Sequence, residues 1–362
     1  MTKVTALFLL SLTYVIAQED PLSCVDRCNI PYNPSDLCHC NTQCTIYSNC
    51  CADYDELCTG LTSSCINRCS ENFDRRNECH CDDLCKDKGN CCPDFDDFCP
   101  NVYEQLTELA NDLYYNDINA ATQYDVTYDY QTHIPDHNVI EDVSPDNLFK
   151  FFNESLFDIP SYKYMRDIFD NYIRYTGTPE DVTQEELDEV KIFLDEVMES
   201  YVMKKAHEYL VEKGLVDPDY YVAFRQDLET IWFEMYTRSS GPIDSSGFEH
   251  VFIGEIKNNA VSGFHGWLMF YLEEKAGLVN YHGFTSMKEP DTLGLQFHWD
   301  GYNKKISSIF TNRSPEFELA IFTVCFKQFP NQLCKFDMAG FPVSIQTWKQ
   351  NDKYIGSAYV VA

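Results

Sequence analysis

The chain has 362 residues, 18 of them cysteine, and a formal net charge of −31 at pH 7. This charge argues against a protein whose whole surface binds a polyanion, because such binding draws on Lys and Arg. Apart from an apolar run near the N-terminus that is too short to cross a bilayer, no stretch of about 20 apolar residues is present, so no membrane span is expected.

The N-terminal segment has the pattern of a secretory signal peptide. Lys3 precedes an apolar run that ends at the small residue Ala17, which predicts a signal peptide over residues 1–17. We therefore expect a secreted, extracellular protein whose cysteines form disulfides. Asn153 and Asn312 each begin an Asn-x-Ser sequence and are predicted N-glycan acceptors.

The next segment contains an internal repeat of cysteines. Eight cysteines recur, each displaced by 41 positions. The first set is Cys24, Cys28, Cys38, Cys40, Cys44, Cys50, Cys51 and Cys58, and the second is Cys65, Cys69, Cys79, Cys81, Cys85, Cys91, Cys92 and Cys99. Each copy is too short to bury an adequate core, so we expect it to depend on crosslinks. His39 and His80 lie between cysteines and leave zinc binding as an alternative, which the dense, even cysteines of an exported chain disfavour.

The spacing C-x3-C-x9-C-x-C-x3-C-x5-CC-x6-C resembles the somatomedin B domain and implies two such domains, over residues 20–60 and 61–100. Spacing alone does not choose among the pairings that eight cysteines allow. The resemblance implies Cys24–Cys40, Cys28–Cys58, Cys38–Cys51 and Cys44–Cys50, with Cys65–Cys81, Cys69–Cys99, Cys79–Cys92 and Cys85–Cys91 in the second copy. It also implies that these modules bind an extracellular protein, whose identity stays open.

The large region, residues 101–362, begins with a stretch to residue 146 that is partly linker. Residues 183–214 predict one long helix, because Thr183 and Glu186 form a capping box and apolar residues follow at helical spacing. Residues 217–238 predict one further helix or a pair of helices.

From residue 248 onward the pattern becomes strand-rich. Strands are predicted at "FEHVFIGEIK" (248–257), "LGLQFHWD" (293–300), "FPVSIQTW" (341–348) and "YIGSAYVVA" (354–362), and helices at "HGWLMFYLEEKAG" (265–277) and after the N-cap residue Ser314. We predict an α+β domain, helical first and strand-rich later. Cys325 and Cys334 are the cysteines left over and are predicted to pair.

Two histidines of this region have similar settings. His250 ends a Gly-Phe-Glu-His sequence, and His265 ends a Gly-Phe-His sequence. Histidine is suited to proton transfer near neutral pH, so the pair can serve as base and acid for one displacement. Cleavage of RNA through its own 2′-hydroxyl needs both, together with a cation near the phosphorane, which Lys304 would supply. The spacing alone is a weak signal, and two core imidazoles are the alternative.

Four strings, "SSGFEHVFIGE", "GFHGW", "QFHWDGYNKKISS" and "SPEFELAIFTVCF", together resemble the EndoU family of uridylate-preferring endoribonucleases over residues 104–362. A secreted branch of that family also carries somatomedin B modules before the nuclease. The resemblance implies an EndoU-like catalytic domain at 101–362 that cleaves single-stranded RNA at uridylates. It further implies 2′,3′-cyclic phosphate ends and stimulation by Mn²⁺, although no metal-ligand motif is visible.

The resemblance also implies roles for individual residues. His250, His265 and Lys304 match catalytic positions, with His265 assigned as base and His250 as acid. Substrate contacts are implied for Ser308, Thr347, Trp348, Glu249 and Glu255. Trp348 is expected to stack on the base, because it replaces a tyrosine that the family has shortly after Thr347.

The distribution of charge leaves room for RNA binding. Residues 242–362 contain 10 Lys+Arg and 12 Asp+Glu, so nearly all of the negative charge lies earlier in the chain. The acidic remainder repels long RNA and favours short or unstructured substrates.

Two other functions compete with the nuclease hypothesis. A noncatalytic extracellular binding protein with a retired nuclease domain is the main alternative. A protease is disfavoured, because neither Gly-x-Ser-x-Gly nor His-Glu-x-x-His is present. We expect a monomer.

Overall fold

A computed structural model describes residues 85–135, 139–238 and 241–362 without interruption. Before residue 85 it describes 23–24, 27, 33, 36–40, 44, 49–54, 58, 64–65, 68–69, 73 and 77–82. The predicted signal peptide, 1–17, lies outside the described residues. The chain divides into two compact units, Met1–Val102 and Tyr103–Ala362. No helix of the described residues is long and apolar enough to cross a membrane.

The first unit contains two similar cysteine-rich knots. Its disulfides are Cys24–Cys40, Cys38–Cys51, Cys44–Cys50, Cys65–Cys81, Cys69–Cys99, Cys79–Cys92 and Cys85–Cys91. The predicted partner of Cys58, Cys28, lies outside the described residues. The same hydrogen bond recurs in both copies, since Ser23 donates to Asp53 and Ser64 donates to Asp94, each at 2.6 Å. Half-cystines dominate the two small cores, which replaces the hydrophobic core that so short a module cannot build.

The zinc alternative does not fit these knots. In the described part of the chain, the two groups of three potential metal ligands consist of cysteine sulfurs, Cys24, Cys40 and Cys51 in one copy and Cys65, Cys81 and Cys92 in the other. All six sulfurs are in disulfides, and a disulfide sulfur is no thiolate ligand.

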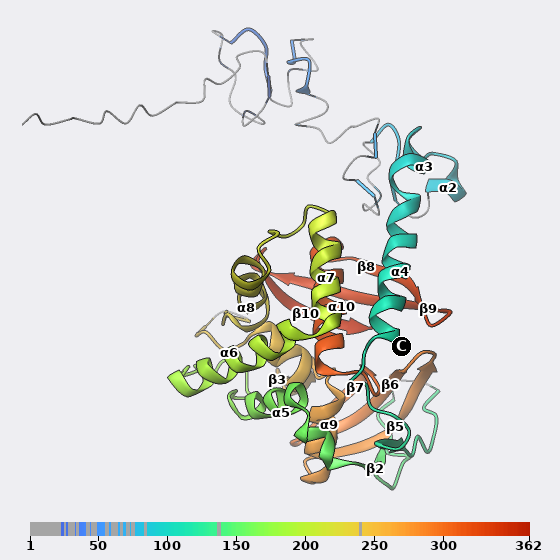
Figure 1. Ribbon diagram of the computed structural model, residues 1–362, viewed down its shortest axis with the longest axis vertical. Coiled ribbons are helices and arrows are strands. Elements are labelled where there is room, and N and C mark those ends of the chain that lie inside the picture. The colour runs from blue at the N-terminus through green and yellow to red at the C-terminus, as the bar shows by residue number, and fades with distance from the viewer. Residues whose placement is uncertain are drawn as a thin grey trace, which may run out of the picture. The chain divides into compact units, whose positions relative to one another are not determined.

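The second unit begins with helices. They are α4 (Pro100–Tyr115), whose first residues still belong to the first unit, α5 (Pro160–Asp167), α6 (Gln184–Glu199), α7 (Tyr201–Glu212) and α8 (Arg225–Phe233), with the antiparallel strands β1 (Val126–Tyr128) and β2 (Phe149–Phe152) between α4 and α5. The two short helices α2 (Cys85–Lys88) and α3 (Phe95–Phe98) precede α4 in the first unit. Figure 1 shows α4 beside β8 and β9, to which Asn111 of α4 is fastened by a 3.1 Å hydrogen bond to the Asp337 carbonyl.

The prediction of one helix over 183–214 was wrong, because the structure divides it at Ser200. The capping box of Thr183 and Glu186 is confirmed at the start of α6. Ser200 has extended backbone (ψ 149°), and its hydroxyl accepts a hydrogen bond from the Met203 N–H at 3.2 Å, so it begins a second helix. Apolar residues continue at helical spacing past Ser200, where Val202 is buried. The periodicity therefore did not reveal that the helix is divided there.

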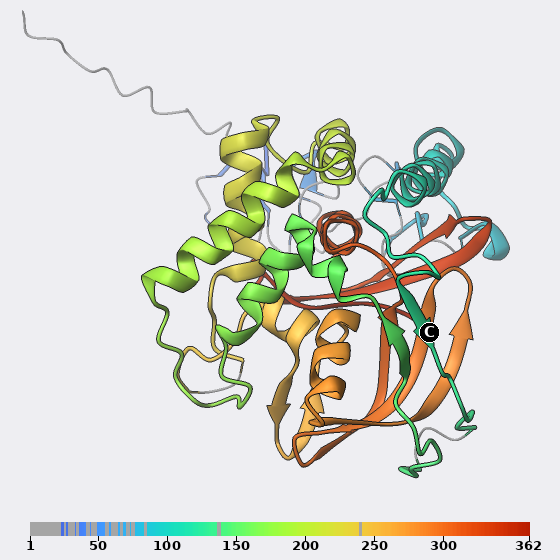
Figure 2. The ribbon, with the colours of Figure 1, turned by 60° about the horizontal axis from the view of Figure 1, so that its bottom comes forward.

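Two antiparallel sheets follow. One has the order β5 (Val279–Lys288), β6 (Thr292–Trp299), β7 (Tyr302–Phe310); the other has the order β10 (Tyr354–Val360), β9 (Phe341–Gln350), β8 (Leu333–Met338). Helix α9 (Trp267–Lys275) packs on β5, and α10 (Pro315–Gln328) lies between α7 and the β8–β10 sheet (Figure 2). The α+β prediction is confirmed, as is the Ser314 N-cap of α10, and Cys325 and Cys334 form a disulfide.

The strand predicted over 248–257 is confirmed at residues 255–257 and wrong before them. Residues Glu249–Ile253 form a π-helical turn, η5, and the strand β3 covers Glu255–Lys257 and pairs with β4 (Ala260–Ser262). Phe248 and Phe252 are four positions apart and their rings pack at 5.1 Å, which favours a helical turn. Because all five residues of the turn are buried, neither a helical nor an alternating pattern stands out in the sequence.

The two predicted glycan acceptors are half-buried. Asn153 caps the short helix η2 (Glu154–Asp158) and donates to Asp125 at 3.2 Å. The Asn312 side chain accepts from the Tyr128 hydroxyl at 3.1 Å. Glycosylation at both sites stays a prediction.

Candidate active site

His250 is held from behind by a carboxylate. Its Nδ1 lies 2.7 Å from Oε2 of Glu255, and both residues are buried. Arg238 and Ser245 donate to the other oxygen of Glu255. Burial raises the pKa of Glu255, but His250, Arg238 and Ser245 outweigh it and lower this pKa to about 2. Because the carboxylate is ionised, Nδ1 of His250 carries the proton and donates, which leaves the lone pair on Nε2.

His265 is fixed in the same manner by a different group. Its Nδ1 lies 2.8 Å from the Ser308 carbonyl oxygen. A carbonyl can only accept, so Nδ1 donates and Nε2 again holds the lone pair. The imidazole is stacked on Tyr359 of β10, with ring centroids 4.8 Å apart and planes 14° apart. The structure therefore gives both histidines the tautomer that a general base at Nε2 requires.

Backbone hydrogen bonds join the two segments that carry these histidines. The Phe264 N–H donates to the His250 carbonyl at 2.9 Å, and the His265 N–H donates to the Val251 carbonyl at 2.6 Å. Lys304 reaches the same point from β7, because its Nζ donates to the Gly263 carbonyl at 2.6 Å. Residues that lie 54 positions apart along the chain, 250 and 304, are thus brought to one place.

Burial and mutual repulsion set the protonation of the three groups. Burial lowers the pKa of His250 to about 4, assisted by Arg238 and opposed by Glu255. Burial, and then the charge of Lys304, hold the pKa of His265 well below its usual value. Burial also lowers the pKa of Lys304 to about 8. At pH 7 the free site therefore contains two neutral imidazoles and one ammonium group.

Gly263 is required for this arrangement. Its φ is +65°, and a Cβ added there would lie 1.8 Å from the His250 carbonyl oxygen. We expect Gly263→Ala to lower the free energy of unfolding by about 2–5 kcal/mol, from left-handed backbone strain and steric overlap together. Gly277→Ala is the matched control, since Gly277 has φ +73° and open space around the added Cβ, so only about 1–2 kcal/mol of strain is expected. Chemical denaturation measures both, and equal losses would contradict the role of close packing.

The other predicted substrate contacts do not all reach the site. Ser308 is beside His265, but its hydroxyl donates to the Val360 carbonyl. Thr347 is fully buried and donates to the Phe329 carbonyl at 3.0 Å, on the opposite face of β9 from its neighbour Trp348. Trp348 is 47% exposed. The Thr347 hydroxyl is therefore engaged in the fold, and a contact between Thr347 and the substrate stays a prediction.

Glu249 and Glu255 have different environments although both were predicted as substrate contacts. Glu255 orients His250, as described above. Glu249 is fully buried and neither of its carboxylate oxygens has a hydrogen-bond partner. Burial, and then the charge of Glu255, raise the pKa of Glu249 well above its usual value, which favours the protonated form of this carboxyl.

Sequence reasoning missed Tyr359, Ser307 and Arg238. Tyr359 is half-buried and lies against His265, and "GSAYVV" had indicated only a strand. The Ser307 hydroxyl donates to the Phe264 carbonyl at 2.8 Å and steadies the segment of His265. Arg238 lies in a turn, where no periodic pattern marks it. The sequence signal available for Tyr359 was Ser357-Ala358-Tyr359, in which a small residue and an aromatic one lie on the same face of the last strand.

The implied Mn²⁺ does not fit a cage made by these residues. Within the described residues, no group of three close His, Cys, Asp or Glu ligand atoms lies at His250, His265 and Lys304. Glu255 is engaged by His250 and Arg238, and the raised pKa of Glu249 disfavours the carboxylate form that a hard cation binds.

Two neutral imidazoles fixed through Nδ1, beside a half-buried lysine ammonium group, have the chemistry of a general acid–base centre for an anionic substrate. The family model "Endoribonuclease XendoU" matches residues 105–360, and "Somatomedin B domain" matches 22–60 and 63–102. The chain belongs to the XendoU endoribonuclease family and carries two somatomedin B domains.

Relatives and a solved structure agree with this assignment. A uridylate-specific endoribonuclease of Mus musculus is 36% identical over 94% of this chain and 79% of its own length. One of Paralichthys olivaceus is 40% identical over 93% of each chain. The solved structure of XendoU, described as a splicing-independent snoRNA-processing endoribonuclease, is 33% identical with a TM-score of 0.62, over 71% of this chain and 96% of its own.

Proposed function

We propose that this endoribonuclease cleaves single-stranded RNA at uridylates and leaves 2′,3′-cyclic phosphate ends. The observation that carries the proposal is the arrangement of His250, His265 and Lys304. Backbone hydrogen bonds join the segments of the two histidines, Lys304 binds the same place through the Gly263 carbonyl, and each imidazole has its Nε2 lone pair free. The uridylate preference rests on the relatives, whose names state it.

In the proposed reaction, Nε2 of His265 takes the proton of the 2′-hydroxyl while the 2′-oxygen attacks phosphorus. The bond from phosphorus to the 5′-oxygen breaks, and His250 gives that oxygen a proton. Lys304 stabilises the charge that develops on the nonbridging phosphate oxygens. His250 must gain a proton before this step, and the negative phosphodiester favours the imidazolium form when it binds nearby.

Tyr359 is better placed than Trp348 to contact the base. Its ring is half-buried and already stacks on His265, whereas Trp348 lies opposite Ser357 in the β9–β10 register. Aromatic rings bind bases by stacking with little dependence on sequence. We therefore assign stacking on the nucleobase to Tyr359.

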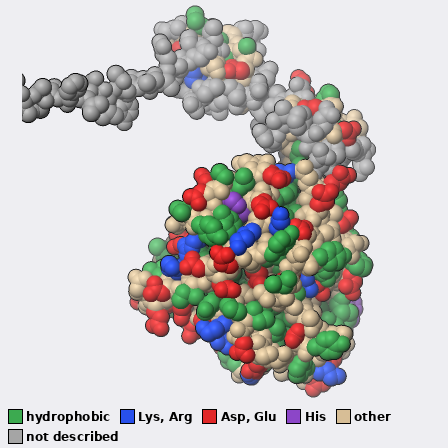
Figure 3. Space-filling model, in the orientation of Figure 1, with side chains coloured by type: hydrophobic (Ala, Val, Ile, Leu, Met, Phe, Trp, Pro, Cys, Tyr) green, Lys and Arg blue, Asp and Glu red, His purple; other side chains and the backbone are tan. Residues whose placement is uncertain are grey.

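The charge of the catalytic unit suits short substrates. Figure 3 shows Asp and Glu side chains spread over the visible face of this unit, with smaller groups of Lys and Arg between them. Long-range repulsion slows the approach of a polyanion. We propose a secreted, monomeric enzyme whose somatomedin B domains bind a protein partner. We also propose that Mn²⁺ stimulates its activity, without being held by protein ligands alone at the catalytic residues.

The decisive experiment uses short oligonucleotides that differ at one sugar. One contains a single ribouridine in a DNA strand, the second has 2′-deoxyuridine there, and the third has ribocytidine. We expect cleavage after ribouridine, slower cleavage after ribocytidine, and none at deoxyuridine, because only the 2′-hydroxyl can attack. Mass spectrometry identifies the cyclic phosphate, which is one water lighter than the linear phosphate.

Two outcomes would contradict the proposal. Equal cleavage of the deoxyuridine strand would exclude attack by the 2′-hydroxyl. No cleavage of any RNA, with or without Mn²⁺, would favour the noncatalytic binding protein instead.

A further inference from the structure

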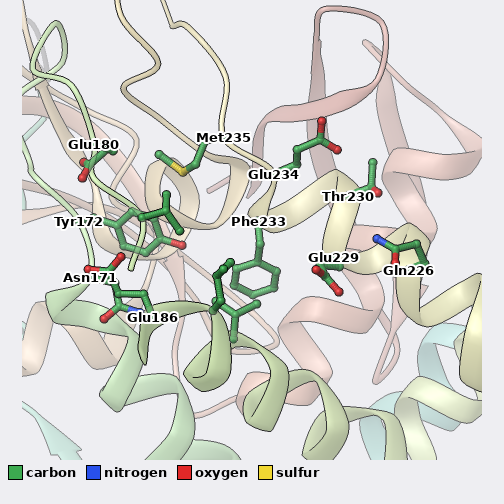
Figure 4. Close-up of a pocket in the computed structure, with 13 residues that line it drawn as sticks. Asn171, Tyr172, Glu180, Glu186, Gln226, Glu229, Thr230, Phe233, Glu234 and Met235 are labelled. Atoms are coloured by element: carbon green, nitrogen blue, oxygen red, sulfur yellow. The ribbon is translucent and has the colours of Figure 1, made fainter. Parts of the chain in front are cut away.

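A cavity of about 290 Å³ lies between α6, α8 and the segment 171–182 (Figure 4). The lining residues include the apolar Val182, Leu187, Val190 and Phe233 together with the ring of Tyr172. None of the three catalytic residues lines it. Its volume is at the lower end of ligand pockets, which are roughly 300–1,000 Å³, and suits a single ring with a short side arm.

The polar part of this cavity is acidic. Glu180, Glu186, Glu229 and Glu234 line it, and its described lining contains no Lys or Arg. Figure 4 shows Glu180 and Glu186 on the side of Tyr172, and Glu229 and Glu234 on the other side of Phe233. Arg225 pairs with Glu229, and Lys353 pairs with Glu234.

Glu180 and Glu186 are the carboxylates without such compensation. Each accepts from a backbone N–H, Glu180 from Ile173 at 2.6 Å and Glu186 from Thr183 at 2.8 Å. Neither forms an ion pair with any residue in the part of the chain that the structure describes. Burial raises the pKa of Glu180, and the nearby charges of Glu186 and Asp244 raise it further. A bound cation would relieve this repulsion.

We propose that this cavity binds a small amphipathic cation. The apolar body of the ligand packs against Phe233 and Val190, and its ammonium group lies against Glu180 and Glu186, near the face of the Tyr172 ring. A neutral ligand of the same shape leaves the carboxylates uncompensated, and an anionic ligand is repelled by them. This site goes beyond the ribonuclease function and does not depend on it.

The cavity also borders the support of the catalytic turn. Phe233 stacks on Phe248 with centroids 4.8 Å apart, and Tyr172 contacts the same ring at 6.4 Å. Phe248 comes immediately before the turn η5 that carries His250. An occupant of the cavity would therefore touch side chains that pack against Phe248, whose ring in turn packs on Phe252 of this turn.

Binding of three matched probes to the full chain tests the proposal. The probes are phenethylamine, 2-phenylethanol and phenylacetate, which share a ring and differ in charge. Isothermal titration without RNA is expected to give phenethylamine an affinity roughly tenfold or more above 2-phenylethanol, with no binding of phenylacetate. Equal affinities for the three probes would overturn the proposal, and this comparison on the unmodified protein needs no variant.

A pair of isosteric variants locates the site. Glu180→Gln keeps an acceptor for the Ile173 N–H and is expected to weaken phenethylamine binding by roughly tenfold. Glu185→Gln is the matched control, since Glu185 is exposed on α6, loses the same charge and does not line the cavity. Unchanged binding to Glu180→Gln, or equal weakening in both variants, would overturn the assignment. Because no RNA is present, either failure is separate from failure of the nuclease proposal.

Discussion

His265→Ala is expected to lower kcat/KM for cleavage of a uridine-containing oligonucleotide by roughly 10²–10⁴-fold, the usual contribution of a positioned general base. The substitution removes Nε2 as proton acceptor, and it also removes the hydrogen bond to the Ser308 carbonyl and the stacking on Tyr359. Steady-state cleavage assays with a fluorescent oligonucleotide measure the effect.

The control for this variant is His298→Ala. His298 is half-buried on β6, in the same sheet as Lys304, and its strand partners are Asn280 and Asn303. Its substitution should leave kcat/KM within about threefold of the unmodified protein, because His298 has no part in the proposed proton transfer. The double variant His250→Ala/His265→Ala should be hardly slower than either single variant, because residues that act as a unit are not additive. Additive losses would contradict a shared proton-transfer step.

The pH dependence of cleavage is expected to steepen above pH 8. Lys304 has its pKa lowered to about 8 by burial, so its ammonium group loses a proton as the pH rises through that value. Above pH 8, kcat/KM should therefore fall by a further factor of about ten per pH unit beyond its trend below pH 8, because the cation is lost. Measurements from pH 5 to 10 at constant ionic strength resolve the change of slope.

Two variants at Lys304 identify the cause of that change. Lys304→Arg keeps a cation at all these pH values, so the steepening near pH 8 should disappear even if the rate falls. Lys304→Met keeps much of the volume without charge and should lower kcat/KM by roughly 10²–10³-fold. If the arginine variant still steepens at pH 8, another group is responsible.

Residue types and local spacing predicted much of this protein. The cysteine repeat, the capping box at Thr183 and the N-cap at Ser314 depend on neighbours in sequence, and such features can be read along the chain. Periodicity failed where burial was uniform. The apolar pattern runs through the break at Ser200, and the buried turn at Glu249–Ile253 has no polar face to reveal its period.

The roles of the predicted substrate contacts could not be read in this way. Thr347 and Trp348 are adjacent in sequence, yet they face opposite sides of β9, so Thr347 is buried and Trp348 is exposed. Glu249 and Glu255 are both acidic residues near His250, and only packing raises the pKa of the first and lowers that of the second. Burial and partner groups, rather than residue type, decide these roles.

By itself the sequence determined which reactive side chains are present: two histidines, a lysine and a set of crosslinking cysteines. Their chemistry follows from the residue type. Only the tertiary structure decided that the two histidines and the lysine lie together. The junction depends on backbone hydrogen bonds from 264–265 to 250–251, on the reach of Lys304 to Gly263, and on Tyr359 arriving from the last strand. These contacts join residues that are distant in sequence, and most of them use backbone N–H and C=O groups, which almost every residue has. No local sequence pattern therefore predicts them.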